Sequence, residues 1–387
     1  MRFKSIDILR ALTMLLMIFV NDLWTLTDIP EWLGHKSAHE DGLGLADVVF
    51  PAFLFIVGLS IPHAIRARLK KGANTLEIIW HIAERTLALV IMGLFMVNLE
   101  NIDRSQLLIA KPWWQFLMTL GFFLIWNQYR DKVFKVVPPL VLRLAGAAIL
   151  VFLAVIYTGE ARDGSQVWMR VHWWGILGLI GWGYLLGALV YLALHNRPIW
   201  IAVICLLLYL LNINEFVSLF GIRFRLVVGA SNHASVMTGV MVTVILIWLQ
   251  EKDKLKYLVP LLLAISAVLL LFGFLTRPEW GISKIRSTPS WTAICAGIST
   301  GTFIILHFIA DRWKLTRWAD IIAPAGTSTL TCYLVPYYVY ALFSITGFYL
   351  TGFLVTGVVG ILKTLVFSLL IIWLTGLLGK LNIKLKI

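Results

Sequence analysis

The chain has 387 residues, of which 60% are hydrophobic and 14% are charged. A typical soluble domain is about half apolar and about a quarter charged, so this composition excludes a soluble enzyme, a coiled coil and a disordered chain. The formal net charge of +13 would suggest nucleic-acid binding in a soluble protein. Here we expect no nucleic-acid partner, because the positive charge lies in loops between long apolar segments.

Apolar segments long enough to cross a lipid bilayer recur from one end of the sequence to the other. They predict an all-α fold, a polytopic transmembrane bundle of about 12 spans (range about 10–12). The predicted spans are 7–27, 46–69, 80–98, 112–128, 136–157, 173–194, 198–216, 234–250, 257–275, 291–310, 320–346 and 352–378. Short connections between them predict a single domain over residues 1–387. The segment 212–233 fits a loop, an interfacial helix or a re-entrant piece.

Lysine and arginine residues are unevenly divided between the two alternating sets of loops. The richer set carries Arg2, Lys4, Arg10, Arg66, Arg68, Lys70, Lys71, Arg130, Lys132, Lys135, Arg197, Lys252, Lys254, Lys256, Arg312, Lys314, Arg317, Lys380, Lys384 and Lys386. The poorer set carries Lys36, Arg104, Lys111, Arg162, Arg170, Arg223, Arg225, Arg277, Lys284 and Arg286. Loops rich in these residues stay in the cytoplasm, so both termini are predicted to be cytoplasmic. The first span lacks a small-residue cleavage site, and we expect it to be a retained helix rather than a signal peptide.

Polar residues gather between the end of the first predicted helix and the start of the second. Asn21 and Asp22 lie near the outer end of an apolar helix, where polar side chains need partners or a function. The next loop holds His35 and His39, and Asp47 begins the second apolar run. A histidine beside a carboxylate can be held in one tautomer and act as a base. Alternatively, Asp47 caps the second helix and the histidines are solvated loop residues.

The sequence gives little support for a metal site or a disulfide framework. His35 and His39 are spaced as two zinc ligands could be, but no third ligand has a telling spacing. Cys205, Cys295 and Cys332 all fall inside predicted spans, without a CxxC pattern. We therefore expect no bound metal.

Charged residues at both membrane faces allow a structural and a functional interpretation. Asp7 and Arg10 share a helix face and can pair with each other, or Arg10 can face a polyanionic ligand from the cytosol. Arg277, Lys284 and Arg286 occupy a predicted outer loop, against the positive-inside trend. An anionic or sugar ligand would explain these cations, as would pairing with acids of the first outer loop.

Three further features lie in or beside the predicted spans. Trp291, at the start of the tenth span, could stack on a sugar ring, although aromatic residues are expected at membrane interfaces anyway. Thr331 and neighbouring hydroxyl residues lie in an apolar helix that Pro336 is expected to kink. Lys363 stands alone in the last span, so it needs a partner or a cavity.

Several stretches together resemble the transmembrane acetyltransferase family typified by heparan-α-glucosaminide N-acetyltransferase. They are RFKSIDILRALTMLLMIFVND, HKSAHEDGLGLADVVFPAFLFIVGLSIP, WWGILGLIGWGYL, SKIRSTPSWTAICAG and AGTSTLTCYLVPYY. The resemblance implies transfer of acetyl from cytosolic acetyl-CoA to the amine of a glucosamine across the membrane. It implies catalytic roles for Asn21, for Asp47 and for a histidine. That histidine is His35 if the chain has a two-residue insertion, or His39 if it has a deletion, and the W-L-G-H sequence favours His35.

The resemblance also implies a set of ligands. Acetyl-CoA would be the co-substrate, and the cations suited to its phosphates are Arg10, Arg66, Arg68, Lys70 and Lys71. The candidate acceptor-binding residues are Asp22, Lys284, Arg286 and Trp291. We expect an amino sugar or short oligosaccharide as acceptor and a bacterial inner membrane as location, and we consider a homodimer as one assembly. Rival functions are a secondary transporter of sugars or small molecules, which should show repeat symmetry that we do not find, and an O-acetyltransferase of an envelope glycan.

Overall fold

The computed structural model describes residues 3–105, 107–129, 137–161, 163–195, 197–217 and 221–387. Five basic loop residues used to predict the topology, Arg2, Arg130, Lys132, Lys135 and Arg162, lie outside these ranges. Most of the described chain is helical, which confirms the all-α class.

Long helices lie at the predicted spans. They are α1 (Lys4–Asp22), α2 (Leu45–Lys70), α3 (Thr75–Glu100), α4 (Lys111–Trp126), α5 (Pro139–Val155), α6 (Ile176–Leu194), α7 (Pro198–Phe216), α8 (Ala230–Glu251), α9 (Leu258–Leu275), α11 (Pro289–Leu306), α13 (Thr329–Thr346) and α14 (Gly357–Lys380). The short helices are α10 (Arg277–Trp280) and α12 (Ala323–Thr327). Single 3₁₀ or π-helical turns cover Leu23–Thr25, Glu31–Leu33, Leu255–Tyr257, His307–Arg312, Arg317–Ala319 and Gly352–Val355. Strands β1 (Gly159–Glu160) and β2 (Gln166–Val167) form a small antiparallel hairpin.

Among the described residues, nine helices are long and apolar enough to cross a membrane. The chain is therefore an integral membrane protein. The three other predicted spans correspond to α1, which carries Lys4, Asp7, Arg10 and Asp22, and to α4 and α5, which have 16 and 17 residues. A span needs about 20 predominantly apolar residues, so the count of about 12 stays a prediction.

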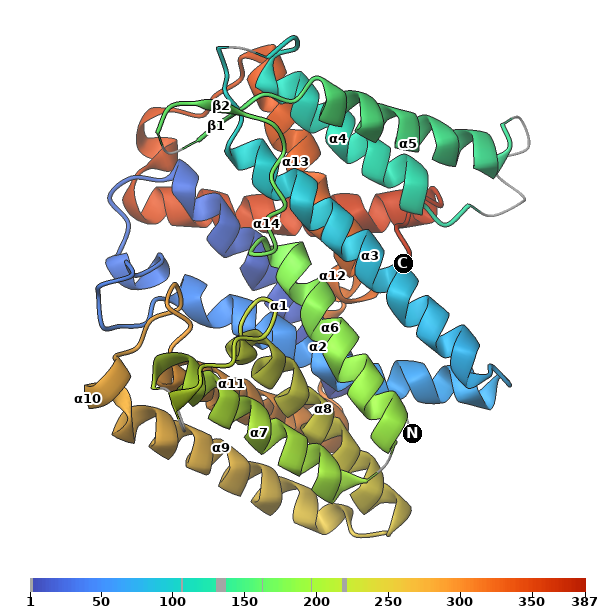
Figure 1. Ribbon diagram of the computed structural model, residues 1–387, viewed down its shortest axis with the longest axis vertical. Coiled ribbons are helices and arrows are strands. Elements are labelled where there is room, and N and C mark those ends of the chain that lie inside the picture. The colour runs from blue at the N-terminus through green and yellow to red at the C-terminus, as the bar shows by residue number, and fades with distance from the viewer. Residues whose placement is uncertain (1–2, 106, 130–136, 162, 196, 218–220) are drawn as a thin grey trace.

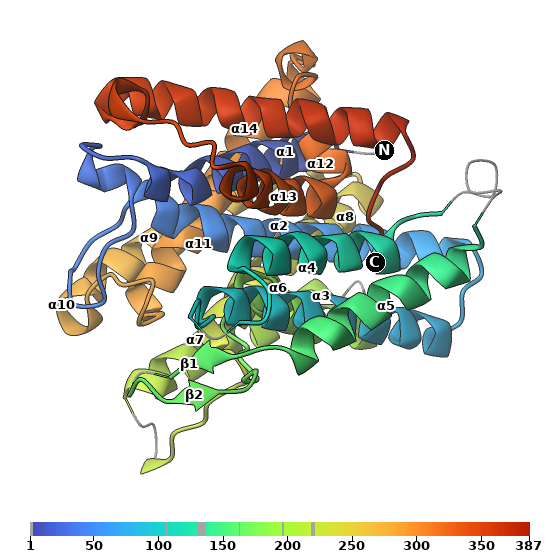
Figure 2. The same ribbon diagram turned by 90° about the horizontal axis from the view of Figure 1, so that it is seen from above.

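The helices alternate in direction along the bundle (Figures 1 and 2). Both chain ends lie at the end of the bundle that also carries the α2–α3 turn, whereas the loop after α1 and helix α10 lie at the opposite end. The structure thus places both termini at one end, and the assignment of that end to the cytoplasm stays a prediction. We call it the inner end and its opposite the outer end.

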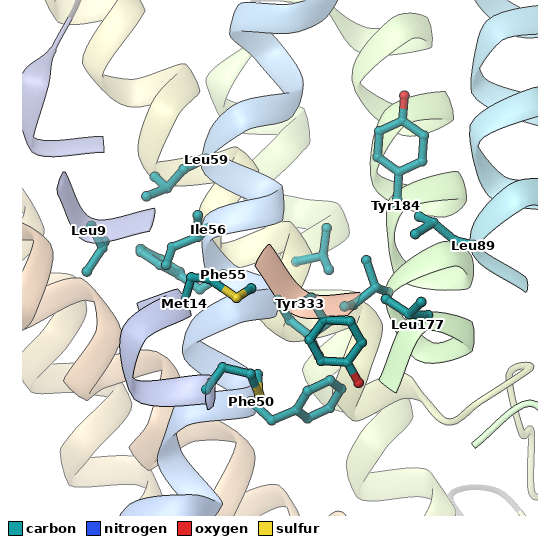
Figure 3. Packing of buried hydrophobic residues seen from close by; sticks show 14 of the residues in the cluster. Leu9, Met14, Phe50, Phe55, Ile56, Leu59, Leu89, Leu177, Tyr184 and Tyr333 are labelled. Atoms are coloured by element: carbon teal, nitrogen blue, oxygen red, sulfur yellow. The ribbon is translucent and has the colours of Figure 1, made fainter. Parts of the chain in front are cut away.

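Helix α2 lies at the centre of the bundle and packs against α1, α6, α8 and α11. Its closest contact is with α8. A Cβ atom added at Gly58 of α2 would lie 1.9 Å from the carbonyl oxygen of Val236 in α8, and a Cβ atom added at Gly239 of α8 would lie 1.9 Å from the carbonyl oxygen of Phe55 in α2. Figure 3 shows the buried side chains that pack around α2, among them Met14 of α1. This contact between backbones fixes the position of α2, which begins two residues before Asp47.

Two segments resolve or correct sequence predictions. Between α7 and α8, the described part of 212–233 that lies outside the helices is a loop. Phe224 N of this loop donates a hydrogen bond to the side chain of Asn214, near the end of α7, at 2.7 Å. The predicted continuous span 320–346 is wrong, because α12 and α13 are separated at Ser328. Gly326 of α12 packs closely on α1, where an added Cβ would lie 2.9 Å from the Asp7 carbonyl oxygen.

Candidate active site

A cavity of about 1570 Å³ lies at the outer end of the bundle, bordered by α1, α2, α3, α6 and α13 and by the loop before α11. The wall of this outer cavity includes five of the residues that the sequence singled out. They are Asn21, His35, Lys284, Arg286 and Trp291. Residues far apart in the sequence therefore meet at one place, where a ligand from the outer side can reach them.

His35 and Asp47 form the central pair of the site. Nδ1 of His35 lies 2.7 Å from Oδ1 of Asp47. The other carboxylate oxygen accepts hydrogen bonds from the backbone N–H groups of Lys36 and Gly44, both at 3.1 Å. Asp47 therefore caps the start of α2, as predicted, and also contacts the histidine, while the catalytic role of the pair stays a prediction. Trp291 Nε1 donates a hydrogen bond to the Asp47 carbonyl oxygen at 3.2 Å and ties α11 to this point.

The contact with Asp47 determines which ring nitrogen of His35 can act in the cavity. A carboxylate at Nδ1 favours a hydrogen on that atom and leaves the Nε2 lone pair as the proton acceptor. The His35 side chain is 50% exposed, whereas that of Asp47 is 2% exposed. The imidazole is thus held from a buried side and presented to the cavity, which is the arrangement that a general base or an acyl acceptor needs.

Lys284 lies beside the same ring. Its Nζ is 3.3 Å from Nδ1 and 3.5 Å from Nε2 of His35. Burial lowers the pKa of Lys284 below its usual value, although the negative charge of Asp47 acts in the opposite direction. The lysine amine therefore lies closer to its neutral form than an exposed lysine would.

The two other polar candidates of the first loop have different surroundings. Asn21 lies on the cavity wall, and no other described residue forms a hydrogen bond with its side-chain amide, which leaves that amide free to bind a ligand. His39 is exposed and is not among the described residues that line the cavity. The geometry therefore favours His35 over His39 as the reactive histidine.

Asp22 lies behind the cavity wall rather than on it. Its buried carboxylate accepts hydrogen bonds from Tyr340 at 2.7 Å, Lys363 at 2.8 Å and Thr364 at 2.7 Å. Asp22 is therefore the partner that Lys363 was expected to need. Through these hydrogen bonds Asp22 joins α1 to α13 and α14. A direct role for Asp22 in binding an acceptor has no support in this arrangement.

The sequence left two explanations open for Arg277, Lys284 and Arg286: pairing with acids of the first outer loop, or binding of a ligand. The structure differs among the three residues. Arg277 pairs with Asp41 of the first outer loop, with Nε and Oδ2 2.8 Å apart. The second oxygen of Asp41 accepts a hydrogen bond from Ile282 N at 2.6 Å. Lys284 and Arg286 instead line the cavity. One cation therefore holds two loops together, and two are available to a ligand.

Further cations of the cavity wall were not singled out by the sequence reasoning. Arg104, Lys111 and Arg225 line the outer cavity together with Glu100 and Glu215. Their positions in the predicted outer loops, where positively charged residues are disfavoured, could have identified them. The surplus of cations makes the cavity suited to a ligand rich in oxygen atoms.

A second pocket of about 290 Å³ extends toward the inner end of the bundle and is lined by Arg10 and Arg85. Arg10 contacts Asp7 at 3.2 Å, which confirms the predicted pair, and also donates to Ser60 at 2.8 Å. The guanidinium of Arg85 lies 4.6 Å from the ring centre of Tyr184. Sequence reasoning missed Arg85, because an isolated arginine in an apolar helix gives no pattern.

The four other cations proposed for acetyl-CoA lie elsewhere. Arg66 pairs with Glu251 at 2.6 Å, and Arg68 contacts His81. Lys70 and Lys71 are exposed at the end of α2. None of the four is among the described residues lining the inner pocket. Within the described ranges, no group of three or more histidine, cysteine, aspartate and glutamate side chains could hold a metal ion.

The first part of this site lies in a range that is similar to known proteins. Residues 2–102 match the sequence profile described as heparan-alpha-glucosaminide N-acetyltransferase, catalytic. Over 97 residues the chain is 34% identical to the human heparan-alpha-glucosaminide N-acetyltransferase and 33% identical to that of Mus musculus. Each alignment covers 25% of this chain and 14% of the relative. The matched range holds Asn21, His35 and Asp47, whereas Lys284, Arg286 and Trp291 lie outside it.

Proposed function

We propose that this chain, whose residues 2–102 match the profile described as heparan-alpha-glucosaminide N-acetyltransferase, catalytic, moves acetyl from acetyl-CoA to an amino sugar across the membrane. The observation that carries the proposal is His35, paired with the buried Asp47, on the wall of a cavity that borders an arginine-lined inner pocket. The membrane in question is proposed to be a bacterial inner membrane.

The inner pocket supplies the donor side of the reaction. CoA carries several phosphates and cannot cross a bilayer, but its narrow pantetheine arm can enter a gap between helices. Arginine binds phosphate oxygens through paired N–H groups. We therefore assign Arg10 and Arg85, which line the inner pocket, to the phosphates at the base of this arm.

The outer cavity supplies the acceptor side. The amine of a glucosamine-type sugar attacks the thioester carbonyl carbon, so that a C–N bond forms and the C–S bond breaks. Nε2 of His35 accepts the proton that the amine loses, and the CoA sulfur leaves and takes a proton in turn. The Asn21 amide donates to the oxygen that becomes negative in the tetrahedral intermediate. If acetyl passes first to His35, the same residues act in two steps.

A transfer assay with two matched histidine variants tests this proposal. The purified chain is incubated with radiolabelled acetyl-CoA and glucosamine, beside His35→Ala and His39→Ala. We expect N-acetylglucosamine from the wild type, a loss of roughly 10²-fold to 10⁴-fold in His35→Ala, and little change in His39→Ala.

Four results would contradict it. Equal activity of the three proteins would remove His35 from the reaction, and a loss confined to His39→Ala would reassign the base. Uptake of sugar into vesicles without CoA, in the absence of any acetyl transfer, would favour a transporter. Acetylation of a hydroxyl rather than the amine would favour the O-acetyltransferase.

A further inference from the structure

The outer cavity and the inner pocket share part of their walls. Ile176, Leu177 and Tyr333 line both of them. The two spaces are nevertheless distinct, so these three side chains separate them. Any thioester that travels from Arg10 to His35 has to pass this point.

Tyr333 is the largest of the three side chains and belongs to α13, opposite Ile176 and Leu177 of α6. It is 6% exposed, in contact with the core of the bundle. Figure 3 shows its ring beside Leu177, at a level between Tyr184, which lines the inner pocket, and Phe50, which lines the outer cavity. The aromatic ring therefore stands across the route between the two spaces.

The α6 side of this separation is held rigidly. Leu177 precedes Gly178, and a Cβ added at Gly93 of α3 would lie 2.5 Å from Gly178 N. Because the backbones of α3 and α6 are already in contact there, α6 has no room to move toward α3. A side chain can change from one staggered rotamer to another while the backbone stays in place, so Tyr333 is the part of the separation that can move.

We propose that the Tyr333 side chain is the partition between the donor pocket and the acceptor cavity, and that it selects acyl groups by their width. This inference rests on the proposed function. A slim acetyl group passes when the ring turns aside, whereas a branched acyl group meets the ring and Leu177. In the resting state the same ring keeps the two aqueous spaces apart.

The first test measures donor selectivity. Wild type, Tyr333→Ala and Tyr333→Phe are compared for transfer from acetyl-CoA and from isobutyryl-CoA to glucosamine. We expect Tyr333→Ala to raise the ratio of isobutyryl to acetyl transfer by roughly 10-fold or more, since one or two methylene groups in a pocket discriminate to about that extent. Tyr333→Phe keeps the ring and should keep the wild-type ratio.

A neighbouring tyrosine provides the matched control. Tyr337 lies one helical turn further along α13, with its ring centre 6.2 Å from that of Tyr333, and lines the outer cavity but not the inner pocket. Tyr337→Ala should leave the donor ratio unchanged. If removal of the buried ring unfolds Tyr333→Ala, Leu177→Ala widens the same point from the α6 side and should raise the ratio in the same direction.

A second test does not depend on catalysis. Sealed proteoliposomes that contain each protein are mixed with radiolabelled erythritol, a small uncharged polyol. We expect faster uptake with Tyr333→Ala than with wild type or Tyr337→Ala, because loss of the ring joins the two spaces.

The two tests separate failure of the partition from failure of the proposed function. An inactive wild type with increased erythritol uptake in Tyr333→Ala would overturn the acetyltransferase proposal and retain the partition. An active wild type with an unchanged donor ratio and unchanged uptake in Tyr333→Ala and Leu177→Ala would overturn the partition and retain the acetyltransferase. An equal increase in Tyr337→Ala would also overturn the assignment to Tyr333.

Discussion

The Asp47 carboxylate serves two neighbours at once, and this shapes the chemistry of the outer cavity. One oxygen contacts His35, and the other accepts the N–H groups of Lys36 and Gly44. A carboxylate saturated with hydrogen bonds and almost fully buried cannot turn away from the ring. The imidazole is therefore held in the orientation that presents Nε2 to the cavity.

The change Asp47→Asn separates the two tasks of this residue. The amide oxygen of asparagine can still accept the N–H groups of Lys36 and Gly44, so we expect only a small change in melting temperature. Acetyl transfer should fall by about 10²-fold or more, because an amide cannot stabilise the protonated imidazole. The check is kcat beside the thermal unfolding curve, with an Asp22→Asn variant measured in parallel. A large loss of stability with normal kcat in the folded fraction would show that Asp47 only caps α2.

At the scale of single residues, the sequence identified candidate site residues but could not assign a role to each of them. The sequence indicated Asn21, His35 and Asp47 as candidate site residues, because polar side chains beside apolar helices need partners or a function. It could not separate Asp22 from Asn21, since adjacent residues on a helix face different directions. It gave no sign of Arg85, whose role depends on where α3 lies against α6.

Close packing between α2 and α8 is the feature of helix arrangement that positions the site. We expect Gly58→Ala and Gly239→Ala each to destabilise the protein strongly, because the new methyl group would meet backbone atoms at 1.9 Å that cannot move aside. Gly379→Ala in α14 is the matched control, since a Cβ there meets nothing within 4 Å. Melting temperatures measured in the same detergent provide the comparison. Equal behaviour of the three variants would mean that the helices are not in backbone contact.

The ion pair between Arg277 and Asp41, which links the two outer loops, predicts how the stability of the fold depends on pH. The hydrogen bond from Arg277 holds the pKa of Asp41 below its usual value, and the Ile282 N–H acts in the same direction. A lowered pKa in the folded state stabilises the fold above the unfolded pKa of about 3.9, and this stabilisation is lost as the pH falls through the folded value. The melting temperature of wild type should therefore exceed that of Asp41→Asn at pH 7.

The difference between these two proteins should shrink as the pH falls from 7 to 3, because protonated aspartic acid resembles asparagine in charge. Arg286→Gln, which changes a cation of the same loop that does not contact Asp41, serves as control for general effects of acid. A difference that stays constant over this range would contradict the ionised pair.

Helix positions were largely predictable from the sequence, whereas breaks in helices were not. Apolar runs of sufficient length predict spans directly, and the helices lie where these runs are. The interruption at Ser328 lies beside Gly326, which packs closely on α1, a contact between distant parts of the chain. Pro336 lies further along, inside α13, and the kink expected there stays a prediction.

Across the whole molecule, two spaces open from the bundle and meet at its middle. The inner pocket carries Arg10 and Arg85, the outer cavity carries His35 and Asn21, and Tyr333 lies at their meeting point. The sequence predicted cations at one face and a histidine at the other. The sequence could not predict that the two spaces share a wall. That wall is formed by α6 and α13, and no sequence pattern in either helix indicates a passage between them.

Transfer across a sealed membrane tests the central claim most directly. Proteoliposomes with glucosamine trapped inside receive radiolabelled acetyl-CoA outside, in a population in which the inner end of the bundle faces outward. The account predicts that labelled N-acetylglucosamine accumulates in the lumen while free CoA appears outside, and that His35→Ala abolishes both. Formation of product only when acetyl-CoA and glucosamine share one compartment would contradict it.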